Sequence, residues 1–342
     1  MSGGTDSSVA ALLMMEQGYE CAGVTMELGG FLSEADLGDA QKAAELLGIS
    51  HHVVDFKQSF AREVIKRFIG AYISGKTPNP CIDCNRFIKF KKILEYAKNL
   101  GFHYMATGHY AKIEESKGRY LLKKATDQKK DQSYVLYRLK KEQLERIKFP
   151  LGHLTKSEVR EIAAKNGFAN AQKKESQDIC FVHKNQTDYA GFIERYTGIT
   201  FQKGDFVDMT GRVLGRHNGI IRYTTGQRKG LGLALPEPMY VYDKNPETNT
   251  VVLAKDEELY AKKLIAGDIN LIATDKLDDK IKIKAKIRYN QAEQPAIAIQ
   301  EGEDAIYVEF EHPQRAITRG QAVVLYDGDI VVGGGTIVRG GV

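Results

Sequence analysis

The stretch that most constrains the fold of this chain is its start, Ser2-Gly3-Gly4-Thr5-Asp6-Ser7-Ser8, with the apolar pattern that follows it. The two glycines allow the backbone to approach a ligand closely, and Val9, Leu12 and Leu13 predict a helix that stops at Gly18. A helix N-terminus that follows a glycine turn presents free amide groups, which makes it a phosphate-binding site. The stretch lacks the spaced second glycine and the Gly-Lys-Ser/Thr ending of the P-loop. We therefore predict a phosphate-binding loop of another class.

Short apolar strands alternate with helices after this loop. The pattern predicts strands at residues 19–26 and 51–56, and helices at residues 36–47 and 58–73. This alternation is typical of an α/β fold with a doubly wound parallel sheet. A phosphate loop on such a sheet follows a buried strand, yet only Met1 precedes Ser2. We therefore expect that the first strand is missing from this sequence.

The later part of the chain has the pattern of a β protein. A hairpin is expected at residues 111–125, where Ser116-Lys117-Gly118 supplies the turn. Closely spaced alternating strands from Leu264 onward suggest a small C-terminal β-barrel. Because 342 residues exceed one ordinary core, we expect two or three domains, and we divide the chain into three. They are residues 1–183 with the phosphate loop, a small central domain at 184–262, and the barrel at 263–342.

Composition argues against a membrane-spanning protein and against a secreted disulfide-rich protein. The chain has 42% hydrophobic and 27% charged residues, no apolar run long enough to span a bilayer and no secretory signal. Four unevenly placed cysteines do not form the disulfide framework of a secreted domain, so we expect a cytoplasmic protein. Between Lys76 and Lys148, 18 Lys and Arg stand against 8 Asp and Glu, a balance of +10 within a net charge of +5. Such a block is typical of a face that binds a polyanion, or of solvated helix faces.

Three cysteines are candidates for chemistry. Two closely spaced prolines predict that Cys81 and Cys84 lie on a stiff exposed loop. This CxxC is compatible with a redox pair, half of a zinc site or chance, and Cys21, inside an apolar strand, is expected in the core. Together with Cys180, the pair can run sulfur transfer through a persulfide and a disulfide, or hold an iron-sulfur cluster with one open iron.

Motifs spread along the whole chain resemble those of one family. They are the opening loop, residues 77–80 followed by Cys84-Asn85, residues 106–110 and 130–134, Cys180 before Phe181, residues 226–232, and the triple glycine at 333–335. Together they resemble the bacterial tRNA-specific 2-thiouridylases, which belong to the PP-loop ATP pyrophosphatases. Because the resemblance runs nearly end to end and in order, it is more specific than any single motif.

The resemblance implies both a fold and a reaction. It implies a PP-loop domain, a small central domain, a C-terminal β-barrel, and an enzyme that replaces the oxygen at position 2 of the wobble uridine of tRNA with sulfur. ATP first adenylates this oxygen, because AMP leaves far more readily than the oxygen itself. With Asp6 as a ligand of Mg²⁺, the residues implied to bind ATP are Ser2, Gly3, Gly4, Thr5, Asp6, Ser7, Met26 and Gly108.

The resemblance also assigns roles to the cysteines. Cys180 would carry the terminal sulfur as a persulfide, loaded by a sulfur-donor protein such as a cysteine desulfurase or a relay. This persulfide would attack the activated ring or release sulfide to do so. Cys84 would free the sulfur and form a transient disulfide with Cys180. Asp6 and these two cysteines are the implied catalytic residues, and Asp178 is a candidate acid or base. Cys81 stands where many relatives carry Asp, so a [4Fe-4S] cluster on Cys81, Cys84 and Cys180 is the alternative.

Contacts to tRNA follow from the same resemblance. The residues implied to receive the flipped-out base or to touch the RNA are Asn79, Pro80, Cys81, His109, Lys130, Asp131, Gln132, Arg288, Tyr289 and Gln321. His109 is equally well explained as a structural histidine that follows a strand. Two competing functions stay open: another PP-loop enzyme, such as GMP synthetase or argininosuccinate synthase, and an RNA-binding relative without ATP chemistry.

Overall fold

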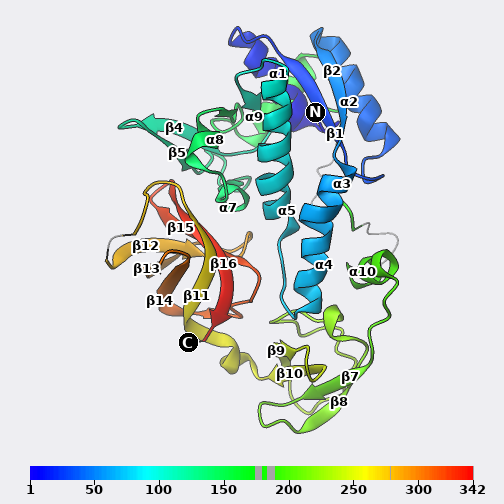
Figure 1. Cartoon of the computed structure of the whole chain (residues 1–342), viewed down its shortest axis with the longest axis vertical. Coiled ribbons are helices and arrows are strands. Elements are labelled where there is room, and N and C mark those ends of the chain that lie inside the picture. Colours follow the sequence, from blue (N-terminus) through cyan, green and yellow to red (C-terminus); the bar gives the residue numbers. More distant parts are fainter. Residues whose placement is uncertain (174–178, 183–188, 278, 342) are drawn as a thin grey trace.

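Three parts make up the molecule. The computed structural model describes residues 1–173, 179–182, 189–277 and 279–341. Figure 1 shows helices and a few strands around the N-terminus, a barrel that carries the C-terminus, and a small sheet at the end remote from the N-terminus. Within these described residues, no helix is both long and apolar enough to cross a lipid bilayer.

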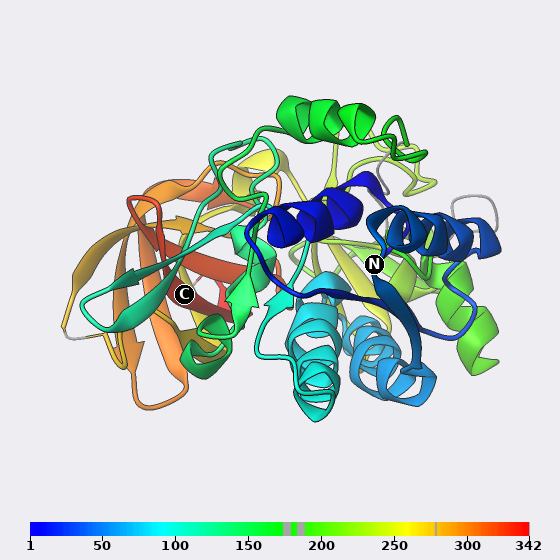
Figure 2. The ribbon, with the colours of Figure 1, turned by 90° about the horizontal axis from the view of Figure 1, so that it is seen from above.

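The N-terminal part has parallel strands between two layers of helices. β1 (Ala22–Glu27) pairs in parallel with β2 (Ser50–Asp55), and β3 (Met105–Ala106) pairs in parallel with β6 (Ile147–Lys148). Figure 2 shows the two dark-blue helices α1 and α2 on one side of β1 and β2, and the lighter helices of residues 57–99 on the other. The helices of this part are α1 (Thr5–Glu16), α2 (Glu34–Leu47), α3 (Lys57–Phe60), η1 (Ala61–Ile65), α4 (Lys66–Ile73), α5 (Pro80–Asp83), η2 (Cys84–Ile93), α6 (Leu94–Asn99), α7 (Ser133–Leu136), α8 (Lys141–Leu144) and α9 (Lys156–Lys165).

The predicted parallel α/β fold is therefore confirmed, although the strands form two separate hydrogen-bonded pairs. Met1 lies beside β1: its main-chain nitrogen donates to the carbonyl oxygen of Val24, and Thr25 Oγ1 donates to the carbonyl oxygen of Met1 at 2.6 Å. The expectation that a first strand is missing stays a prediction.

Local signals explain several element boundaries. The side chain of Ser33 accepts a hydrogen bond from the Asp36 amide at the start of α2, and Gly48, with φ of +67°, ends that helix as predicted. The predicted hairpin is β4 (Lys112–Ser116) and β5 (Arg119–Lys123), and both of its turn residues have positive φ. Because β5 also pairs with β16, the hairpin extends the sheet of the barrel.

The central part is a four-stranded sheet in the order β8-β7-β10-β9, preceded by α10 (Tyr189–Thr197). Its remaining elements are β7 (Gly204–Val207), β8 (Val213–His217), η3 (Ile220–Arg222), β9 (Tyr240–Asn245), β10 (Thr250–Ala254) and η4 (Asp256–Leu259). Buried Phe206 and Val251 of this sheet share one apolar core with Phe60, Phe68 and Tyr72 of the N-terminal part. The central sheet is thus packed against the helices that precede the CxxC.

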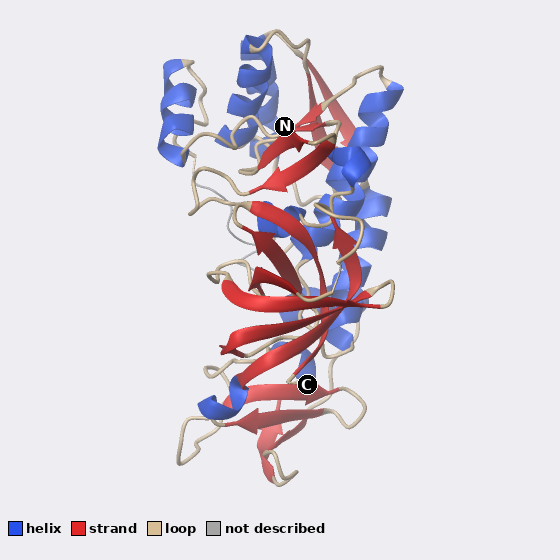
Figure 3. Ribbon diagram, turned by 90° about the vertical axis from the view of Figure 1, so that its left-hand side faces the viewer, coloured by secondary structure: helices blue, strands red, loops and turns tan. Residues whose placement is uncertain are grey.

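Six antiparallel strands form the predicted C-terminal barrel. They are β11 (Tyr260–Leu271), β12 (Ile281–Lys286), β13 (Gln294–Glu301), β14 (Ala305–Arg315), β15 (Ala322–Asp327) and β16 (Ile330–Gly340). The barrel closes because β11 pairs with both β14 and β16. Figure 3 views the molecule from the side of the barrel, with helices above and behind its strands. The expectation of a C-terminal β-barrel is confirmed.

Candidate active site

The glycine loop forms the start of α1. Gly4 is the N-cap residue in an extended conformation, and no side chain of the described residues caps the helix. The hydroxyls of Ser7 and Ser8 donate to the carbonyl oxygen of Gly4 at 3.0 and 3.3 Å, and Thr5 Oγ1 donates to the carbonyl oxygen of Asn170 at 2.6 Å. These hydroxyls stabilise the loop, so the backbone amides of the first turn are the groups that it offers to an anion.

Two glycines of the site are required by protein packing. A Cβ atom on Gly3, whose φ is +69°, would lie 2.1 Å from the carbonyl oxygen of Asp36. A Cβ atom on Gly108 would lie 2.7 Å from the carbonyl carbon of Asp6. These close approaches bring the loop against α2 and against residues 107–110. The expected approach of the loop backbone to a ligand stays a prediction. Met26, at the carboxyl end of β1, packs partly buried against two apolar cores.

Asp6 is held by two side chains that sequence reasoning missed. Its Oδ1 atom accepts hydrogen bonds from Lys156 Nζ at 2.6 Å and from the Tyr110 hydroxyl at 3.0 Å. Lys156 is buried in the first turn of α9. The sequence shows the capping box at Thr155 that starts this helix, but it does not indicate that Lys156 contacts Asp6. A carboxylate has further acceptor positions, so Asp6 retains capacity for Mg²⁺, which protein sites typically bind through one or two carboxylates and substrate phosphates.

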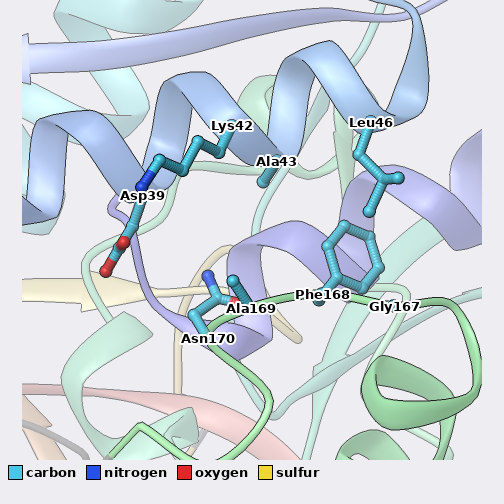
Figure 4. Close-up of a pocket in the computed structure, with 8 residues that line it drawn as sticks. All are labelled: Asp39, Lys42, Ala43, Leu46, Gly167, Phe168, Ala169 and Asn170. Carbon is cyan, nitrogen blue, oxygen red and sulfur yellow. The ribbon is translucent and has the colours of Figure 1, made fainter.

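A second set of contacts holds the loop from the side of α2. Lys173 Nζ donates to Gly3 O at 3.2 Å and forms ion pairs with Asp36 and Asp39 at 2.7 and 2.6 Å. Asn170 Nδ2 also donates to Gly3 O, at 3.1 Å. A pocket of about 170 Å³ lies between α2 and residues 167–170. Figure 4 shows Asp39, Lys42, Ala43 and Leu46 of α2 on one side of it and Asn170 on the other, with the Lys42 side chain directed along the helix toward Asp39. Lys173 and Asn170 thus hold the loop, and sequence reasoning missed them because they lie so far from Gly3 along the chain.

The expectation of an exposed loop around the CxxC is wrong. Asn79 is an N-cap residue whose side chain accepts a hydrogen bond from the Cys81 amide at 3.1 Å, and Pro80 is the first residue of α5. A proline fits this position because the amide it lacks has no partner within the helix. Helical backbone then runs without a break through Asn99. Cys84 is half-buried and packs against the apolar core, whereas Cys81 is exposed.

The three candidate thiols lie close enough to affect one another. Burial raises the pKa of the Cys84 thiol to about 12, with smaller contributions from Cys180 and Cys81 and an opposing one from Lys89. Cys180 is exposed as a residue, yet the surrounding protein raises the pKa of its thiol to about 11. All three are free thiols. At neutral pH they are therefore protonated in this arrangement.

The structure also bears on the expectations for Cys21 and for a metal site. Cys21 lies before β1 rather than within a strand, is only half-buried, and donates to the Tyr19 carbonyl oxygen, so the expected core cysteine is wrong. Among the residues that the structure describes, no group of three His, Cys, Asp or Glu side chains is placed to hold a metal ion. The expectation of an iron-sulfur cluster on the three thiols stays a prediction, because the ligands of a cluster lie further apart than those of a single ion. Asp178 lies outside the described residues.

Several residues expected at the RNA take part in internal contacts. His109 is buried between Phe90 and Phe149, its Nδ1 lies 2.8 Å from Thr107 Oγ1, and burial lowers its pKa well below the usual value. The Asp131 carboxylate accepts hydrogen bonds within its own turn, from the Ala125 amide and from the Ser133 amide and hydroxyl. Gln132 Oε1 accepts from the Tyr110 amide at 2.9 Å. Asp131 and Gln132 therefore fix the segment that carries Tyr110 to Asp6, and Lys130 is the half-buried residue beside them.

The barrel residues of the predicted RNA set lie near the CxxC segment. Gln321 Nε2 donates to the Thr77 carbonyl oxygen at 2.8 Å, and the Thr77 amide donates to the Arg319 carbonyl oxygen at 2.8 Å. The Arg288 guanidinium donates to the Ala316 carbonyl oxygen at 2.7 Å, and the Tyr289 ring centroid lies 6.1 Å from that of Tyr134. The structure thus brings Gln321 to the segment that leads to Asn79 and Pro80.

Comparison with known proteins identifies the family. Residues 1–184 match the family model described as tRNA methyl transferase HUP domain, residues 190–255 its PRC-barrel domain, and residues 261–337 an aminomethyltransferase beta-barrel domain. The chain is 50% identical to the tRNA-specific 2-thiouridylase MnmA of Clostridioides difficile, over 99% of this chain and 97% of that protein. It is 49% identical to the protein of the same name from Acetivibrio thermocellus, over 98% and 97% of the two chains.

The chain belongs to the tRNA-specific 2-thiouridylase family. The resemblance read from the motifs is confirmed, and so is the expectation of an enzyme. Within this 2-thiouridylase family member, the glycine loop and the cysteines lie in the region matched by the HUP domain, and Gln321 in the region matched by the barrel domain.

Proposed function

We propose that the chain catalyses the ATP-dependent 2-thiolation of the wobble uridine of tRNA in the cytoplasm. The observation that carries the proposal is the joint presence of an open phosphate-binding helix start and of two neighbouring thiols, Cys84 and Cys180, in a chain that matches 2-thiouridylases over 99% of its length. A different PP-loop enzyme needs the phosphate-binding helix start but not the two neighbouring thiols. An inactive RNA-binding relative needs neither.

The glycine loop would bind ATP through its backbone. The amides of the first turn of α1, together with the positive end of the helix dipole, suit the phosphates, and Met26 and Gly108 border the nucleotide. Asp6 would hold Mg²⁺, which when bound neutralises phosphate charge. Lys156 fixes the orientation of the Asp6 carboxylate. Adenylation of the uridine O2 then makes AMP the leaving group.

Sulfur transfer would use the two cysteines in sequence. The terminal sulfur of a Cys180 persulfide attacks C2 of the adenylated base, a carbon–sulfur bond forms, and AMP departs with the electron pair of the broken carbon–oxygen bond. The Cys84 sulfur, after losing its proton, attacks Cys180 Sγ and breaks the persulfide bond, whose electrons stay on the thiouridine sulfur. A Cys84–Cys180 disulfide remains, and an external thiol reductant must return it to two thiols. Because burial raises the pKa of the Cys84 thiol and keeps it protonated at neutral pH, a proton acceptor must act before Cys84 attacks.

We favour the persulfide over the iron-sulfur alternative. The two neighbouring thiols Cys84 and Cys180 suffice for the persulfide route, so no step is assigned to a cluster on Cys81, Cys84 and Cys180. An absorption band in the visible region of anaerobically purified protein that disappears in Cys81→Ala would reverse this choice.

The substrate tRNA would enter along the basic segment between Lys76 and Lys148. A uridine in a stacked anticodon cannot reach the thiols, so it must be flipped out toward Asn79, Pro80 and Cys81. A persulfide-donor protein would load Cys180, which is exposed.

A single-turnover assay under anaerobic conditions tests the proposal. Purified protein, magnesium-ATP, a persulfide source and unmodified tRNA are combined, and thiolated tRNA is detected by its retardation on a mercury-containing gel. We expect a retarded band that requires ATP and is lost in Cys84→Ser and Cys180→Ser, while Cys21→Ser, which changes a thiol before β1, retains it. A retarded band with Cys180→Ser, or no band with the unchanged chain, would contradict the proposal.

A further inference from the structure

The strand β11 of the barrel has an irregularity that faces the catalytic helices. Its pairing register with β16 shifts between Gly267 and Asn270, and Asp268 within this bulge has φ of +47°. A non-glycine residue in the left-handed region costs conformational energy and persists where the surrounding contacts hold it. Contacts from the surrounding structure must therefore stabilise the bulge.

Those contacts are made with the N-terminal part of the chain. Asp268 Oδ2 lies 2.9 Å from Arg86 NH1 and 2.8 Å from Arg138 NH2, and Arg138, which is buried, also donates to Thr336 Oγ1 at 2.8 Å. Asn270 Nδ2 donates to the carbonyl oxygens of Tyr137 and Leu139, just after α7, at 2.8 and 2.9 Å. Burial opposes the charge of Asp268, but the two guanidiniums outweigh it and hold the pKa of its carboxyl below the usual value. At neutral pH the bulge thus presents a carboxylate to two arginines.

Arg86 connects this bulge to the reactive cysteine. It lies two residues after Cys84 in η2, and it is the residue of that first turn that contacts the barrel through an ion pair. Its guanidinium also lies 4.8 Å from the centroid of the Phe87 ring, while the guanidinium of Arg67 lies 4.5 Å from the same centroid. The segment that carries Cys84 is therefore held by the barrel through Asp268 and by α4 through Arg67.

We propose that the β11 bulge positions Cys84: Asp268, by binding Arg86 and Arg138 together, fixes the first turn of η2 in the orientation in which Cys84 reaches the sulfur of Cys180. Asp268 is a positioning residue, because it acts through Arg86 and touches neither sulfur nor RNA. The role rests on the function proposed above for the two cysteines. Through Asp268 the barrel would contribute to sulfur transfer as well as to any contact with tRNA.

The first test measures the geometry without tRNA or ATP. Oxidised glutathione accepts two electrons from Cys84 and Cys180 and leaves a disulfide between them, whose formation is followed by mass spectrometry of peptides. We expect Asp268→Asn to slow this disulfide by about tenfold, since a small misplacement of reacting groups has effects of at least this size. Asparagine tolerates the left-handed conformation, and glycine adopts it freely, so Asp268→Asn and Asp268→Gly remove the carboxylate without backbone strain.

A matched control lies a few residues further along the chain. Asp275 also bridges two cations of the N-terminal part, Arg119 at 2.8 Å and Lys141 at 3.2 Å, but neither is near Cys84 in the sequence or in η2. We expect Asp275→Asn to form the disulfide at the rate of the unchanged chain. Equal rates for the Asp268 variants and the unchanged chain, or equal losses in the Asp268 and Asp275 variants, would overturn the proposal.

The second test uses single-turnover thiolation of tRNA. Asp268→Asn should lower the maximal rate by about tenfold and leave the tRNA concentration at half-saturation unchanged. Arg86→Met should have a similar effect, and the double variant should be no slower than the slower single variant, because both changes break one link. Additive losses would refute that link. If the unchanged chain thiolates no tRNA, the proposed function fails, whereas the disulfide test still decides the role of Asp268.

Discussion

Replacing Gly108 with alanine tests whether the phosphate-binding loop depends on its contact with residues 107–110. The φ of Gly108 is not positive, so alanine suffers no backbone penalty there. Its Cβ would lie 2.7 Å from the carbonyl carbon and 2.9 Å from the carbonyl oxygen of Asp6, closer than carbon and main-chain atoms pack. The first turn of α1 must then shift. We expect a loss of about 1–3 kcal/mol in the free energy of unfolding, and pyrophosphate release slower by about tenfold or more because the loop amides move.

Urea unfolding of three proteins provides the assay. Gly70→Ala is the control, because Gly70 lies in α4 with no atom within 4 Å of an added Cβ. Alanine there should raise the free energy of unfolding by about 0.5–1 kcal/mol, since it suits a helix better than glycine. Replacing glycine with alanine should thus lower the free energy of unfolding at position 108 and raise it at position 70. A Gly108→Ala protein that is as stable as the unchanged chain and releases pyrophosphate at its rate would refute the reasoning.

Substitutions at three other residues test contacts of the same structure. Asn79→Ala should destabilise the protein by about 1 kcal/mol through loss of the α5 cap, and Asn79→Asp should not, as thermal unfolding can measure. Lys156→Met should cost about 3 kcal/mol in urea unfolding, because it leaves the partly buried Asp6 carboxylate without its cation. Burial lowers the pKa of Lys244 to about 8, so above that pH the unfolded chain holds a proton that the native chain has released, and stability rises toward pH 10.5. Lys244→Met should remove this rise, up to about 3 kcal/mol, and an equal rise in both proteins would contradict the assignment.

Local patterns in the sequence predicted much of the fold. The apolar helix after the glycine loop, the end of α2 at Gly48 and the turn of the β4–β5 hairpin all follow from residues that lie within a few positions of one another. The CxxC segment shows where such reasoning failed. Two prolines suggested a loop, but Pro80 at the first position of a helix, after Asn79 as a cap, starts one.

Sequence reasoning predicted the glycine loop and the cysteines of the candidate site. It missed the side chains that hold the loop and Asp6. Lys156, Lys173 and Asn170 lie more than a hundred residues from the groups they hold, and no spacing rule connects them. Asp131 and Gln132 illustrate the converse case. The family resemblance implied that they contact RNA, which stays a prediction, and the structure adds hydrogen bonds within the protein that the sequence did not indicate.

By itself the sequence determined the order of elements, the parallel α/β fold, the barrel and the family, because periodicity, turn residues and motifs are local or linear properties. Only the tertiary structure decided which groups face one another. It placed Lys156 on Asp6, it brought Gln321 to Thr77, and it set the Asp268 bulge against the helix of Cys84. These contacts arise from packing between segments distant along the chain, and a buried ion pair or a close approach of two backbones leaves no pattern in the residues between them.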